Sequence, residues 1–174
     1  QAERLFAEAR AIVVRSGLRA AEARLLVNEG DAGYQAGNLT LSRACARQAL
    51  EIAAAISDRR LQSLAAGNLA ETLIDVGDYA AAQPIAARAL DLAAAIDYGG
   101  GKSANRENLA RLRLARGEPA LAVAEAEAGI AVAEALNMRA RMGSLRILHA
   151  RALTALGRHT DALLAAEAAR ALAT

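Results

Sequence analysis

Four glycines recur at a constant interval along the chain, at Gly37, Gly77, Gly117 and Gly157. A short polar or turn-forming pair follows each of them, and then an alanine-rich amphipathic stretch. Glycine is the usual residue in the left-handed conformation that ends a helix, and Pro119 suits the first turn of the helix that comes next. The spacing therefore predicts a repeated unit in which a tight turn joins two helices.

The apolar residues follow the same interval and draw one helical stripe, as at Leu50, Leu90 and Ile130. Small residues that let two helices approach closely recur at positions 30, 70, 110 and 150. No segment is a candidate strand, so the fold class is all-α. We expect helices over residues 2–15, 19–36, 40–57, 59–76, 79–96, 103–116, 119–136, 139–156 and 159–172.

The composition excludes several classes of protein. Hydrophobic residues make up 55% of the chain and aromatic residues only 2%, which predicts folded helices packed through small side chains. The formal net charge is only +2, and there is no basic stripe with stacking aromatics, which argues against nucleic-acid binding. No apolar run reaches the roughly 18 residues that span a bilayer. Lone Cys45 rules out an internal disulfide, and we expect a cytoplasmic protein.

One repeat carries a recognisable set of small, aromatic and glycine positions: Asn68-Leu69-Ala70, Leu73, Gly77-Asp78-Tyr79, Ala82 and Ala89-Leu90. This set resembles the signature of the tetratricopeptide (TPR) repeat. The usual period of that repeat is about 34 residues, so a period of 40 resembles its long-helix variety. Similar elongated repeats are familiar from kinesin light chains, from Leu-Gly-Asn repeat adaptors and from bacterial regulators resembling the maltose activator.

The resemblance implies a single superhelical array of about four helical hairpins after one leading helix. The expected divisions are 1–17 for the leading helix, then repeats at 18–57, 58–97, 98–137 and 138–174. Because the chain begins inside a periodic helix and stops soon after another, we expect it to be a piece of a longer protein.

Asn28, Asn68 and Asn108 recur in phase, although asparagine is a poor residue for a helix interior. The resemblance places them on the first helix of each hairpin, facing the concave surface. In similar families an asparagine ladder there holds the backbone of an extended peptide. The alternative is that these amides only bridge adjacent helices, because buried polar groups also need partners.

Charged residues follow each asparagine position by one helical turn, as Asp31, Glu71, Arg111 and Arg151. They predict a binding face that is acidic near its start and basic near its end, which would orient a charged peptide. Arg106 and Arg146 are expected to add to the basic end, while Arg24 and Tyr34 flank the first repeat. Salt bridges between neighbouring helices, such as Glu71 with Arg111, are the alternative.

Three features invite a chemical role, and the sequence argues against each. The segment Gly99-Gly100-Gly101-Lys102-Ser103 lacks the glycine spacing and the preceding strand of a phosphate-binding loop, so we interpret it as a flexible turn between repeats. His149 and His159 have no second ligand at a metal-site spacing. Cys45 has no histidine partner in its helix.

The sequence thus predicts a protein-interaction module, not an enzyme, with no cofactor and no metal. Its expected partner is a protein or peptide bound through Asn28, Asn68, Asn108, Asp31, Glu71, Arg111, Arg151, Arg24 and Tyr34, with no nucleic acid and no membrane. The alternative is an effector-sensing or regulatory domain of a multidomain bacterial signalling protein or transcription regulator. Self-association through the terminal helices is a further option.

Overall fold

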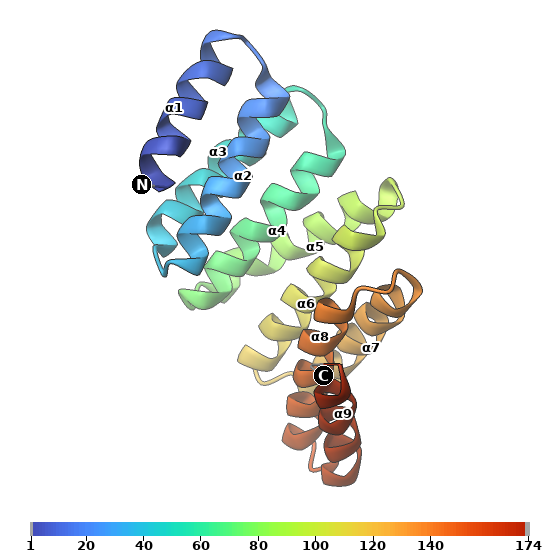
Figure 1. The fold of residues 1–174 in the computed structure, drawn as a ribbon. Helices are drawn as coiled ribbons and strands as arrows, with labels where there is room; N and C mark the ends of the chain where they lie inside the picture. The colour runs from blue at the N-terminus through green and yellow to red at the C-terminus, as the bar shows by residue number, and fades with distance from the viewer. Residues whose placement is uncertain (1, 173–174) are drawn as a thin grey trace. The chain divides into compact units, whose positions relative to one another are not determined.

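A computed structural model describes residues 2–172, and all of its regular structure is helical (Figure 1). The helices are α1 (Ala2–Arg15), α2 (Arg19–Gln35), α3 (Leu39–Ala55), α4 (Arg59–Asp75), α5 (Tyr79–Ala95), α6 (Gly99–Ala115), α7 (Pro119–Ala135), α8 (Arg139–Ala155) and α9 (His159–Ala171). The all-α prediction is confirmed, and every described helix except α6 agrees closely with its expected bounds.

The chain divides into two compact units. Unit 1 covers residues 1–92 and unit 2 covers residues 93–174, so α1 to α4 and most of α5 belong to unit 1, and α6 to α9 to unit 2. In unit 1, α2 packs against α1, α3 and α4; in unit 2, α7 lies between α6 and α8, and α8 packs on α9. Each unit is therefore built from helices packed on their sequence neighbours, as in other repeat arrays.

Every connection between consecutive described helices has the same short form. After α2, the amide of Gly37 donates to the carbonyl of Tyr34, and the amide of Asn38 donates to that of Gly33, at 2.9 and 2.8 Å. This pair of hydrogen bonds is the Schellman motif, and it needs a left-handed residue in the middle of the turn. The left-handed residues fall at regular intervals, half a repeat apart, at Gly17, Gly37, Ser57, Gly77, Asp97, Gly117, Asn137 and Gly157.

The helix α6 begins at Gly99, one turn earlier than expected, so the glycine triplet is the first turn of a helix. A Cβ on Gly101 would lie 2.5 Å from Cδ1 of Tyr98, and one on Gly99 would lie 2.6 Å from Cδ1 of Leu136, so a larger residue at either position would displace these side chains. The prediction of a flexible turn at this segment was therefore wrong, because the glycines let the Tyr98 ring and Leu136 pack closely on the helix start.

Small side chains fill the core, as the composition predicts. Alanines at equivalent repeat positions are fully buried, among them Ala70 and Ala110, and a few large side chains pack among them, such as Leu26 in unit 1 and Leu145 in unit 2. Where Gly30 replaces alanine in the first repeat, a Cβ would lie 3.2 Å from the Cβ of Cys45 in α3. Close approach of the helices thus depends on residues with little or no side chain.

Among the described residues, no helix is both long enough and apolar enough to cross a membrane.

Candidate ligand-binding face

The predicted site residues all lie on the first helix of a hairpin. Unit 1 carries six of them on α2 and α4, and unit 2 carries three on α6 and α8. We call the surface formed by the first helices of a unit its first-helix face. Unit 1 thus has Arg24, Asn28, Asp31, Tyr34, Asn68 and Glu71, and unit 2 has Asn108, Arg111 and Arg151.

Two hydrogen bonds join α2 to α4 on the first-helix face of unit 1. The Asn68 amide donates to the Asp31 carboxylate, and the Tyr34 hydroxyl donates to the Asp75 carboxylate. Asn68 therefore bridges adjacent helices, which is the alternative role that the sequence left open. Of the predicted residues, the structure brings Asp31, Asn68 and Glu71 into one group.

The Asp31 carboxylate has an unfavourable electrostatic environment, although part of the residue remains exposed. Burial by neighbouring atoms raises its pKa above the ordinary value, repulsion from Glu71 raises it further, and the hydrogen bond from Asn68 opposes both effects. Asp31 and Glu71 thus repel each other, and the Asn68 amide partly offsets this repulsion by its hydrogen bond to Asp31.

A cleft of about 410 Å³ opens beside α2, where the chain enters α4. Arg24 and Asn28 line it together with Asp58 and Arg60, over an apolar floor of Val27, Leu61 and Leu64. Arg24 and Asn28 are both exposed, and among the described residues neither side chain has an intramolecular hydrogen bond or ion pair. Two predicted residues therefore lie together at a concave site with free polar groups.

The predicted site residues of unit 2 are not all as exposed as Asn28 is in unit 1. Asn108 is 7% exposed, Arg111 is half-buried, and each interacts with neighbouring groups. Arg151 is exposed and lines a groove between α8 and α9. The three asparagines thus form no uniform ladder, because the first is exposed, the second is half-buried and the third is buried.

Two arginines expected to extend the basic end are engaged elsewhere. Arg106 pairs with Glu125 of α7 at 2.7 Å, and Arg146 of α8 pairs with Glu134 of α7 at 2.5 Å. Sequence reasoning also missed the ion pair between Arg141 of α8 and Glu107 of α6. These contacts offset much of the positive charge that the spacing of the arginines implied.

Buried hydroxyls form a second repeated feature that the sequence reasoning missed. Ser63 donates to the carbonyl of Ala89 at 2.9 Å, and Ser103 donates to the carbonyl of Gly129 at 3.1 Å. Both donors lie at the same sequence distance from their acceptors, and the two serines are one repeat apart, so the repeat phase could have revealed them. They tie the first helix of a hairpin to the second.

The surroundings of Cys45 and His149 do not favour a chemical role for either side chain. Burial, with added repulsion from Glu29, raises the pKa of the Cys45 thiol to about 11, against a smaller opposing effect of Arg10. A thiol with so high a pKa is a poor nucleophile. His149 Nε2 lies 3.3 Å from Glu127 Oε1. No group of three metal-binding side chains occurs in the part of the chain that the structure describes.

Comparison with known proteins identifies the fold. No family model and no curated protein sequence matches the chain. Among solved structures, one from Podosopora anserina, described as kinesin light chain nearly identical TPR-like repeats, superimposes with a TM-score of 0.73. That match has 19% sequence identity and covers 97% of this chain and 84% of the other. The chain therefore has the TPR-like fold of sequential helical hairpins that its repeat signature predicted.

Proposed function

We propose that this chain is a protein-interaction module and that its first-helix face binds an extended peptide. The observation that carries the proposal is the cleft beside α2, where Arg24 and Asn28, which have no intramolecular partner among the described residues, lie above the apolar side chains of Val27 and Leu61. An amide can donate to and accept from a peptide backbone, while an apolar floor takes an alternate side chain. This combination suits a short peptide segment.

Charge around the cleft favours a peptide with an acidic group at this point. Arg24 and Arg60 flank the cleft, and Asp58 already accepts a hydrogen bond from the amide of Leu61 at 3.0 Å, where it caps α4. A guanidinium group binds a carboxylate in a planar, two-pronged geometry. A few residues along the same face, Asp31 and Glu71 are acidic, so a peptide with an acidic and then a basic residue matches unit 1.

The test starts from a random peptide library selected on the intact chain, and the selected peptides are then measured by calorimetry. Replacing Arg24 with alanine removes a charge-assisted hydrogen bond and should weaken binding about tenfold. Asn28→Ala should weaken binding by a smaller factor. Asn68→Ala should have an effect only through Asp31, because its amide is already engaged.

Arg43→Ala is the matched control, because Arg43 is an exposed arginine on α3 that does not line the cleft. The proposal is wrong if Arg24→Ala and Arg43→Ala weaken the selected peptides equally. It is also wrong if selection enriches no peptide at all while circular dichroism shows the chain fully helical.

A further inference from the structure

Both methionines of the chain, Met138 and Met142, lie where α8 begins. Each packs against a small apolar cluster between α7 and α8, whose buried members are Ile130, Ala133 and Leu145. Methionine is flexible and apolar, so it fills irregular gaps at the edge of such a cluster. The packing of α8 on α7 at this end of unit 2 therefore depends on two side chains that can be oxidised.

Solvent reaches both methionines. Each is only half-buried, whereas Ala133 and Leu145, against which they pack, have no exposed surface. The residue after Met142 is Gly143, and a Cβ there would have no neighbour within 4 Å, so this side of α8 is open. A small oxidant can therefore approach the sulfur atoms without prior unfolding of the unit.

Hydrogen peroxide oxidises a thioether in one balanced step. A lone pair of the sulfur attacks one peroxide oxygen, the O–O bond breaks and an S–O bond forms. The proton of the transferred oxygen passes through solvent to the departing hydroxide, which leaves as water. The sulfur loses two electrons, and an apolar side chain becomes a polar sulfoxide that accepts hydrogen bonds but donates none.

Unit 1 shows what a polar group needs at the position of Met142. Two repeats earlier this position holds Gln62, whose amide donates to the carbonyl of Ala53 at 3.3 Å. The equivalent carbonyl in unit 2 belongs to Ala133, a member of the cluster that Met142 covers. A sulfoxide oxygen beside this carbonyl would bring two acceptors together without a donor, which disfavours the packed arrangement.

We propose that Met138 and Met142 form an oxidation site, at which conversion to the sulfoxide by hydrogen peroxide loosens the start of α8 from α7. Arg141 lies between the two methionines in the sequence and pairs with Glu107 of α6. The same loosening therefore weakens the contact between the first helices of unit 2, so oxidation controls how firmly α8 is held on both of its neighbours.

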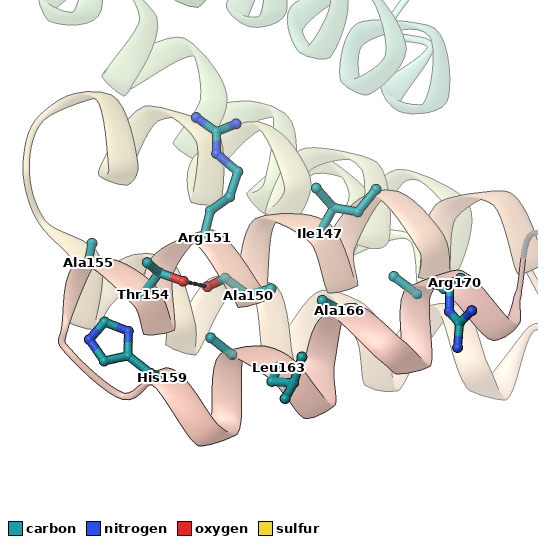
Figure 2. Close-up of a pocket in the computed structure, with 11 residues that line it drawn as sticks. Ile147, Ala150, Arg151, Thr154, Ala155, His159, Leu163, Ala166 and Arg170 are labelled. Atoms are coloured by element: carbon teal, nitrogen blue, oxygen red, sulfur yellow. Dashed lines mark hydrogen bonds between the residues drawn. The ribbon is translucent and has the colours of Figure 1, made fainter.

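Two other regions of the molecule should not respond to oxidation. The groove between α8 and α9 is lined by Ile147, Ala150 and Leu163 among other residues, and neither methionine lines it (Figure 2). The cleft beside α2 lies in unit 1, and neither methionine lines that cleft either. The oxidation site is therefore separate from the proposed peptide site.

The test treats the full chain with hydrogen peroxide, locates the added oxygen by mass spectrometry, and measures amide hydrogen exchange on the same peptides. Exchange over residues 130–145 should become about tenfold faster, while residues 19–75 keep their rates. The double variant Met138→Leu, Met142→Leu keeps apolar side chains of similar volume and should not respond. A Cys45→Ala chain should respond as the native chain does, because the Cys45 thiol is buried.

Reduction should reverse the effect. A methionine sulfoxide reductase, with a dithiol as the electron donor, returns the sulfoxide to the thioether and releases water, so the original exchange rates should return. The proposal is overturned if both methionines are oxidised without faster exchange over residues 130–145, or if the double leucine variant responds like the native chain. Equal acceleration in unit 1 would also overturn it, since the effect would then be general unfolding.

Discussion

Units 1 and 2 pack their helices in the same way but use different polar contacts between them. Most helices of both units have 17 residues and are joined by short turns, and one hairpin in each unit has a buried serine, Ser63 in unit 1 and Ser103 in unit 2, that ties its first helix to its second. Between successive first helices the units differ. In unit 1 neutral donors meet carboxylates, as with Asn68 and Asp31, whereas in unit 2 an arginine meets a carboxylate, as with Arg141 and Glu107.

This comparison shows which part of the repeat is constrained. Turn geometry and small buried residues recur because the backbone path depends on them. Polar contacts between first helices vary because several pairs fit the same spacing. The exposed face can therefore change its charge from repeat to repeat without changing the fold.

The largest expected effects come from the core. Leu26→Ala in unit 1 and Leu145→Ala in unit 2 each remove a side chain that is 0% exposed, and each should destabilise its unit by about 2–5 kcal/mol. Because contacts in a repeat array are mostly between neighbours, each variant should lower amide hydrogen-exchange protection mainly within its own unit. Equal loss of protection in both units for both variants would show that they unfold as one body.

The contacts between first helices should respond differently to salt. Glu107→Ala removes an ion pair and should cost roughly 0.5–1 kcal/mol at low salt, and much less in about 1 M sodium chloride. Asn68→Ala removes a hydrogen bond to Asp31 and should cost about 1 kcal/mol with little salt dependence. Urea unfolding at both salt concentrations measures the difference, and the same salt dependence for both variants would contradict the comparison.

Most of the fold could be predicted from the sequence because the same pattern occurs in each repeat. Periodic glycines, apolar positions and alanines agree with one another, so helix bounds follow from phase. The start of α6 could not be predicted in this way. A glycine triplet is typical of a loop, and only the positions of Tyr98 and Leu136 in space show why residues without side chains suit the start of this helix.

The site could be predicted only in part, for a physical reason. The repeat position predicts that an asparagine lies on the first helix of a hairpin. Its exposure depends on which side chains of the neighbouring helix pack against it. Asn28 faces an open cleft while Asn108 is buried, although both occupy the same repeat position. The partners of Arg106 and Arg146 lie on α7, so no pattern along the first helices alone could identify them.

Turn residues provide a smaller test of the two units. Ser57 in unit 1 and Asn137 in unit 2 lie in turns between hairpins and have positive φ, at 55° and 52°, whereas the turn within each hairpin has glycine at the equivalent position. Asparagine tolerates this conformation better than serine does. Ser57→Gly should therefore raise stability by about 0.5 kcal/mol, after the entropy lost by glycine is included, and Asn137→Gly should change it by less. Thermal unfolding measures both, and a greater gain at Asn137 would contradict this ranking.

The smallest expected effects are those of pH on stability, and they have opposite signs in the two units. The raised pKa of Asp31 means that folded unit 1 binds more protons than the unfolded chain between the ordinary value of 3.8 and the raised one, so its stability increases as the pH falls through that window. In unit 2, hydrogen bonds from Lys102 and Arg113 lower the pKa of Asp97 and Glu118, so their stabilisation is present above the ordinary values of 3.8 and 4.5 and is lost as the pH falls below them. At pH 7, Asp31→Asn should therefore stabilise the chain and Glu118→Gln should destabilise it, and both effects should shrink toward pH 3. Urea unfolding at the two pH values measures the change in free energy of unfolding that each variant causes. Changes of the same sign would contradict the inference that Asp31 destabilises unit 1 while Glu118 stabilises unit 2.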